Sequence, residues 1–172
     1  MGQTVKDFIK NNLVDEFKTI QQTESHHYLS FGLISLGIEF IGACLDEKNG
    51  FFTEGKSDER FRKAVSDLFP ASYQNYNIKK DKFDLYKNLR CGLLHIFVPG
   101  PNIELIQESE RVLFGNCNHL EIKKIRGNDR LILVSQEFFK DYENACNSII
   151  SKIENKELKH EKVYKEILGF EP

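Results

Sequence analysis

Closely spaced cysteines are absent from this sequence. Its four cysteines, Cys44, Cys91, Cys117 and Cys146, are scattered over 172 residues and include no C-x-x-C pair. That spacing predicts neither a disulfide framework nor a zinc knuckle, and free thiols are the ordinary state in a reducing compartment. No apolar stretch suited to secretion follows Met1, so we expect a cytoplasmic protein.

Motifs for metals and cofactors are missing as well. The sequence has no glycine-rich phosphate loop and no G-x-S-x-G nucleophile elbow. His26, His27, His119 and His160 show neither H-x-x-x-H spacing nor a paired carboxylate. We therefore expect neither a metal nor a cofactor.

A large excess of basic residues is also lacking, because the formal net charge is -2 and the pI is near 6.2. This balance argues against a protein that holds nucleic acid by bulk electrostatics. Any RNA contact is expected to be local, although a solvated face is the commoner explanation of such charge runs. The local excess lies at 79–90, where five cations outnumber Asp81 and Asp84: Lys79, Lys80, Lys82, Lys87 and Arg90.

No linker rich in proline, glycine or serine divides the chain, so residues 1–172 are expected to form a single domain. Apolar periodicity and capping residues predict an all-α bundle of about five to six helices. Tyr73 and Tyr76 are expected to pin a connecting loop to its core, which is commoner than stacking on bases. The predicted helices are 4–22 with Thr4 as cap, 25–46, 57–69 with Ser57 as cap, 80–97, one starting at Ser135, and 156–168.

The segment 111–134 has an alternating rather than a helical pattern. It predicts a small antiparallel β-hairpin inserted between the helices, with its main turn at 127–129. Four basic side chains in this segment either extend the basic surface of residues 79–90 or form a solvated face of the hairpin. They are Lys123, Lys124, Arg126 and Arg130.

The predicted helix at 25–46 is apolar almost all the way round, which places it at the centre of the bundle. A membrane span is the competing interpretation, but Glu39 lies near its middle and no basic flank orients it. Close packing of another helix is predicted on the face that carries Gly32, Ser35, Glu39, Gly42 and Ala43.

Glu39 is the only charged side chain between Ser25 and Asp46, so it requires a cation or hydrogen-bond donors. Arg90 or His95 is the partner that we predict. A purely structural ion pair, or a position at a solvated edge, is the alternative.

Arg90 and His95 lie within the predicted helix at 80–97. An arginine stabilises the charge that develops on a phosphate, and a histidine transfers a proton near neutral pH. Together they suffice for cleavage of a phosphodiester without a metal. Helical geometry places Arg90 at the edge of the buried side, and His95 on a polar face with Asp84, Asn88 and Cys91.

The spacing of five residues separates Arg90 and His95 by about 140° on an ideal helix, too far to grip one phosphate together. A distortion at Gly92, or a site assembled from two protomers, would resolve this difficulty. The alternatives are an ion pair from Arg90 to Glu39 and a locally hydrogen-bonded or exposed His95.

The segment Arg90-Cys-Gly-Leu-Leu-His95 is similar to the R-x4-6-H signature of the HEPN superfamily, the higher eukaryote and prokaryote nucleotide-binding helical domains. The resemblance implies a metal-independent endoribonuclease of a toxin-antitoxin or defence system, with Arg90 and His95 as catalytic residues. It also implies a homodimer whose cleft joins two copies of the motif, an RNA substrate, and an antitoxin or other protein partner. Asn88 and Glu39 are expected to orient the catalytic pair.

Active members of that superfamily often carry a polar residue after the arginine, whereas this chain has Cys91. The departure favours the alternative function, a non-catalytic module that binds a nucleotide or a protein partner. A helical scaffold with an accidental motif match is the third possibility.

Overall fold

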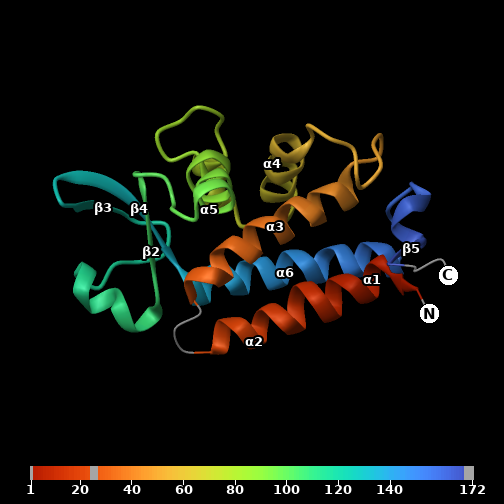
Figure 1. Cartoon of the computed structure of the whole chain (residues 1–172), viewed down its shortest axis with the longest axis horizontal. Coiled ribbons are helices and arrows are strands. Elements are labelled where there is room, and N and C mark those ends of the chain that lie inside the picture. The colour runs from red at the N-terminus through yellow and green to blue at the C-terminus, as the bar shows by residue number, and fades with distance from the viewer. Residues whose placement is uncertain (1, 24–26, 169–172) are drawn as a thin grey trace.

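The computed structural model describes residues 2–23 and 27–168. Its helices form layers, with α3 in the middle, α4 and α5 above it, and α1, α2 and α6 below it in the view of Figure 1. α3 packs against α2, α4 and α6, which confirms the mainly helical fold. The α-helices are α1 (Val5–Phe8), α2 (Glu16–Gln22), α3 (His27–Leu45), α4 (Ser57–Leu68), α5 (Gly92–Ile96) and α6 (Ser135–Glu154).

The first predicted helix is present, and a wide π-helical stretch, η1 (Ile9–Asp15), joins α1 to α2. Thr4 caps it as expected, because its hydroxyl oxygen accepts a 3.2 Å hydrogen bond from the Asp7 amide. The buried stripe of this helix includes Val5, Ile9 and Phe17. The apolar stripe therefore packs the helix against the core, and the Thr4 cap sets where the helix begins.

Helix α3 supplies the central core with Phe31, Ile34, Ile38 and Ile41, all essentially inaccessible to solvent. The predicted start at residue 25 lies outside the described residues. By length and composition α3 is also able to cross a membrane. Core helices of soluble proteins share that property, so absence of membrane association stays a prediction.

The small residues of α3 have different neighbours. At Gly42 an added Cβ would overlap the backbone carbonyl of Arg60, so this glycine sets the close approach of α3 to α4. A Cβ at Gly32 meets nothing within 4 Å. The close-packed face predicted from sequence therefore exists at Gly42 but not at Gly32.

Ser57 begins α4 but does not cap it, contrary to expectation, because the hydroxyl is used elsewhere. After α4, the 3-10 helix η2 (Ala71–Tyr76) crosses the bundle. Tyr73 is fully buried, which confirms that it pins this connection to the core.

The motif helix is shorter than the predicted 80–97. It consists of a π turn, η3 (Tyr86–Cys91), followed by α5. Lys80 adopts a left-handed backbone conformation at φ 68°, and Asp84 accepts a 3.2 Å hydrogen bond from the Lys87 amide. The helix therefore begins after Asp84, which caps it.

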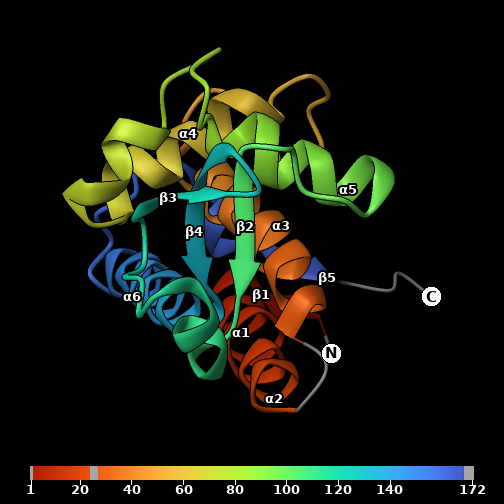
Figure 2. The ribbon, with the colours of Figure 1, turned by 90° about the vertical axis from the view of Figure 1, so that its left-hand side faces the viewer.

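The predicted β-hairpin belongs to a larger mixed sheet, with strand order β2-β4-β3. The antiparallel pair of β3 (Ile122–Ile125) and β4 (Asn128–Val134) confirms the hairpin, while β2 (Ile103–Ile106) adds a parallel strand. The turn lies at 126–127 rather than at the predicted 127–129, because residues 128 and 129 pair with β3. The sheet lies at one end of the helices, away from the two ends of the chain (Figures 1 and 2). The molecule thus contains more sheet than a single hairpin.

The β-structure predicted for 111–134 is wrong at its start, because residues 111–114 belong to the 3-10 helix η4 (Glu108–Phe114). Glu110 accepts a 2.7 Å hydrogen bond from the Gln107 amide and completes a capping box. Val112 and Leu113 are both exposed. Because neither apolar side chain is buried, the alternating pattern does not form a strand here.

The helix expected at 156–168 is also wrong. The chain forms a one-turn 3-10 helix, η5 (Glu161–Tyr164), and then β5 (Glu166–Leu168), which pairs antiparallel with β1 (Gln3–Thr4). Lys162 donates to the backbone carbonyls of Asp46 and Asn49. Residues 161–168 do not form the predicted helix because β5 pairs with β1 and Lys162 binds the loop after α3.

Candidate functional site

Arg90 and Glu39 form a direct ion pair between the motif helix and α3. The Arg90 Nε and Nη2 atoms lie 3.0 and 2.7 Å from Glu39 Oε2. The Ser57 hydroxyl donates to Glu39 Oε1 over 2.7 Å. Of the two partners expected for Glu39, the structure therefore brings Arg90 to it, and Ser57 from α4 is an additional contact that the sequence did not predict.

The Arg90 guanidinium also lies over an aromatic ring. Its Cζ atom is 5.6 Å from the ring centroid of Tyr86, and Arg62 Cζ lies at the same distance from that ring. Burial lowers the pKa of Arg90, but the charge and hydrogen bonds of Glu39 more than offset it, so the pKa is raised overall. Arg90 is thus a permanent, oriented cation.

One edge of that guanidinium remains open. Within the described residues, Nε and Nη2 have hydrogen-bond acceptors, whereas Nη1 has none. The Arg90 side chain is 14% exposed. An anion is therefore able to approach Nη1 while Glu39 holds the opposite edge.

Asn88 has a different environment from the one predicted. It is buried, and its amide nitrogen donates to the carbonyls of Lys82 and Asp84 at 3.1 and 3.0 Å. The Gly100 amide donates to the Asn88 carbonyl over 2.6 Å. Asn88 therefore joins the start of the motif helix to the loop that follows it, and it does not share an exposed face with His95.

Asp84 likewise departs from the predicted polar face. It is buried, and Arg62 Nη2 contacts its two carboxylate oxygens at 2.9 and 2.8 Å. The helical wheel misplaced both residues because the true helix begins at this capping aspartate and opens with a wide π turn.

His95 lies in α5 and is exposed. No hydrogen bond or ion pair involves its ring among the described residues, so the structure does not join it to Arg90. The π turn ends at Cys91, so four of the five steps from Arg90 to His95 lie in the regular helix α5. The helix is therefore distorted, but not in a way that brings the two side chains into contact.

Gly92 has another role than the predicted distortion. A Cβ there would lie 2.6 Å from the carbonyl oxygen of Val98 and 2.9 Å from the Gly100 amide nitrogen. The missing side chain lets the loop after α5 fold back onto the motif helix.

Three consecutive apolar residues, Ile96, Phe97 and Val98, are exposed directly after His95. Phe97 has a left-handed backbone with φ 58°, which is unusual for a bulky residue. The Tyr28 hydroxyl donates to the Phe97 carbonyl over 2.6 Å. This contact with α3 holds an apolar protrusion at the end of the motif helix.

An apolar groove of about 240 Å³ lies beside this protrusion, between α3 and α5. Gly32 lies in it with open space above the backbone. The groove contains no charged side chain and is lined by Tyr28, Leu29, Gly32, Leu33, Leu36, Leu93, Leu94 and Phe97.

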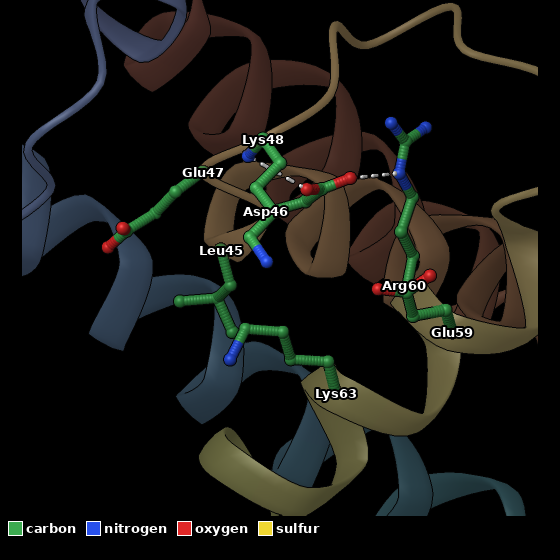
Figure 3. Close-up of a pocket in the computed structure, with 7 residues that line it drawn as sticks. All are labelled: Leu45, Asp46, Glu47, Lys48, Glu59, Arg60 and Lys63. Atoms are coloured by element: carbon green, nitrogen blue, oxygen red, sulfur yellow. Dashed lines mark hydrogen bonds and ion pairs between the residues drawn. The ribbon is translucent and has the colours of Figure 1, made fainter.

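A second hollow, of about 410 Å³, lies between the end of α3 and α4, and its polar lining was not anticipated (Figure 3). Arg60 donates to Asp46 over 3.2 Å and to the carbonyls of Gly50 and Phe51 at 2.5 and 2.8 Å. Burial raises the pKa of Asp46, but hydrogen bonds from Asn49, Lys48 and Arg60 lower it to about 2 overall. Its buried charges are already paired, so this hollow organises the loop after α3.

A buried polar chain at the base of the sheet was also not predicted from the sequence. His119 Nδ1 accepts the Val134 amide proton over 3.0 Å, and its Nε2 lies 2.7 Å from the Tyr73 hydroxyl. That hydroxyl donates to Asp141 over 2.8 Å. Burial and then Arg111 lower the pKa of His119 to about 4, so the ring is neutral at pH 7.

No group of three or more histidine, cysteine, aspartate or glutamate residues suited to a metal occurs in the described ranges. His26 lies outside those ranges. Comparisons of the chain with protein-family models, with curated proteins and with solved structures found no match. Function is therefore inferred from the motif helix and its surroundings.

Proposed function

We propose that this protein is a metal-independent endoribonuclease of HEPN type. The observation that carries the proposal is an exposed histidine with no structural bond, on the same short helix as an arginine whose Nη1 edge is open. A proton-transfer group and a fixed cation are the two components that RNA cleavage without a metal requires.

In the proposed reaction, the ribose 2′-hydroxyl attacks the adjacent phosphorus and the bond to the 5′-oxygen breaks. His95 of one protomer removes the proton from the 2′-oxygen, and His95 of the other protomer supplies the proton that the leaving 5′-oxygen takes up. Arg90 stabilises the negative charge of the pentacovalent phosphorus through Nη1. The products are a 2′,3′-cyclic phosphate end and a 5′-hydroxyl end.

Glu39 and Asn88 act as positioning residues in this proposal. Glu39 holds two nitrogens of Arg90 and is itself fixed by Ser57. Asn88 ties the first turn of the motif helix to the loop after it. The carboxylate and the amide therefore set where the guanidinium lies before substrate binds.

A second copy of the chain completes the proposed site. Among the described residues no hydrogen bond joins Arg90 to His95, and a spacing of five residues separates them by about 140° on an ideal helix. We therefore propose that one phosphate is held by Arg90 and His95 of different protomers. The apolar groove and the exposed Ile96, Phe97 and Val98 beside the motif helix support such an association. A toxin-antitoxin or defence role in the cytoplasm, with a protein antitoxin, is the setting that we propose.

The test is cleavage of a mixed RNA pool by wild type and His95→Ala in EDTA. We expect wild-type products with cyclic phosphate ends and a loss of at least about 100-fold in His95→Ala, the usual contribution of an acid-base group. His160→Ala, at a partly buried histidine outside the motif helix, is the control for loss of a histidine, and circular dichroism verifies folding of both variants. Equal cleavage by wild type and His95→Ala would contradict the assignment of His95.

The second candidate is a non-catalytic module that binds a nucleotide or a protein partner. It is favoured by the ion pair itself, because Glu39 occupies two of the three nitrogens that Arg90 would offer a phosphate. Folded wild type that cleaves no RNA in the pool would support this candidate over the ribonuclease.

A further inference from the structure

Two cationic segments that are far apart in sequence meet on one surface. Lys82, just before the motif helix, forms a 3.2 Å ion pair with Asp129 near the turn of the β3–β4 hairpin. Asp129 is the antiparallel partner of Lys124. The basic stretch at 79–87 and the basic hairpin therefore lie side by side.

Several of these cations are already neutralised. Lys79, Lys82, Lys123 and Arg130 each contact a carboxylate within 4 Å. Four others are exposed and have no carboxylate partner among the described residues: Lys80, Lys87, Lys124 and Arg126. These four cations lie on two segments that meet at the Lys82–Asp129 ion pair, and they outnumber the exposed Asp81 between Lys80 and Lys82. On a chain with a net charge of -2 they are a local excess of positive charge.

A partly exposed aromatic ring lies among these cations. Lys82 Nζ is 5.1 Å from the ring centroid of Phe83. The edge-on packing of Phe83 against Tyr76, with centroids 6.4 Å apart, fixes the ring orientation. Ile78 nearby is 55% exposed. Cations beside a fixed aromatic ring are the combination that holds a single strand through its phosphates and its bases.

We propose that this surface binds single-stranded RNA, with phosphates on Lys80, Lys87, Lys124 and Arg126 and a base against Phe83. Lys87 is on the motif helix itself, eight residues before His95. The strand therefore runs from the hairpin along the motif helix towards Arg90 and His95. This inference rests on the proposed ribonuclease function and names the surface that delivers its substrate.

Binding of a fluorescein-labelled single-stranded RNA with 2′-O-methyl groups tests the surface, because blocked 2′-hydroxyls prevent the proposed cleavage. Fluorescence anisotropy is measured in EDTA at salt concentrations between about 50 and 200 mM, a range over which phosphate binding weakens strongly. We expect K124E/R126E and K80E/K87E each to weaken binding at least about tenfold. For each cation that no longer binds a phosphate, the slope of log K against log salt should flatten by about 0.7.

The matched control is K10E/K159E, which makes the same charge change at two exposed lysines that have no carboxylate partner among the described residues. Lys10 lies in η1 and Lys159 follows α6, so both are outside the hairpin and the motif helix. We expect the control to bind RNA within about twofold of wild type, because neither lysine belongs to the proposed surface. An equal loss in the control, an unchanged affinity of K124E/R126E, or equal competition by polyglutamate would overturn the inference.

The two proposals fail in different ways. Wild type that binds the blocked RNA through these residues but cleaves no natural RNA refutes the catalytic proposal and leaves the surface intact. Wild type that cleaves RNA with K124E/R126E at full affinity and rate refutes the surface alone.

Discussion

His119 illustrates how burial fixes the charge state of one residue. Its Nδ1 accepts the Val134 amide proton, so the ring proton lies on Nε2, where it is donated to Tyr73. A second ring proton would convert Nδ1 into a donor facing another donor. The hydrogen bond at the junction of β4 and α6 therefore requires the neutral imidazole.

We predict that His119 makes the protein less stable in acid. The pKa is about 4 in the folded state and about 6.5 in the unfolded chain. Between these values the unfolded state binds more protons, so stability falls as pH falls through this window and is fully retained above it. The expected loss from pH 7.5 to 4.5 is about 2.5 kcal/mol.

Chemical denaturation of wild type and His119→Gln at both pH values measures this loss. Glutamine offers an acceptor and a donor but does not titrate, so the wild-type loss should exceed that of the variant by about this amount. The raised pKa of Asp141 and the lowered pKa of His160 contribute to the pH dependence of stability in both proteins, so they do not account for a difference between them. Parallel pH dependence in the two proteins would show that His119 does not titrate as described.

The pairing of Arg90 with Glu39 was accessible from sequence because a lone carboxylate on an apolar helix needs a cation. The hydrogen bond from Ser57 to Glu39 could not be predicted, because a serine at the start of a helix is expected to cap that helix. Burial of Asn88 was missed for another reason. A wheel with about 100° per residue assumes a regular helix, whereas this one begins with a π turn.

At the scale of elements, the approach of α3 to α4 depends on one glycine. A side chain at Gly42 would meet the rigid backbone of Arg60, while Gly32 on the same helix faces open space. We predict that Gly42→Ala destabilises the protein by about 1–3 kcal/mol, as in overpacked cores. Gly32→Ala should stabilise it by up to about 1 kcal/mol, because alanine favours the helix.

Urea unfolding of the two variants and wild type provides the measurement, with Gly32→Ala as the matched control. If Gly32→Ala destabilises the protein as much as Gly42→Ala does, the loss at Gly42 does not come from contact with the α4 backbone.

The elements that sequence predicted well are those with a buried periodic stripe: the first helix, α3, α4 and α6. Those that it missed depend on distant partners. Strand β5 pairs with β1 at the opposite end of the chain, and β2 pairs with β4 although η4 and β3 lie between them in sequence. Periodicity within a window contains no information about such pairs.

At the scale of the whole molecule, the proposed homodimer makes a prediction about association. We expect sedimentation velocity to show a concentration-dependent dimer, because Phe97 and its neighbours expose a continuous apolar surface. Replacing Phe97 by serine should weaken dimerisation at least about tenfold, as loss of a buried anchor does. Leu113→Ser removes an apolar side chain on η4 that is 79% exposed, against 67% for Phe97, and should leave dimerisation unchanged.

A wild type that stays monomeric at every concentration would contradict the proposed two-protomer site. Dissociation caused by Leu113→Ser and not by Phe97→Ser would instead locate the contact on the β2-β4-β3 sheet side of the molecule.

The pairing of β5 with β1 also orders events during synthesis. Residues 3 and 168 are Cα partners, so this pair cannot form until almost all of the described chain has left the ribosome. Lys162, which anchors the loop after α3, arrives equally late. The helices must therefore assemble while the loop after α3 is not yet anchored, and residues 162–168 complete the described fold after them.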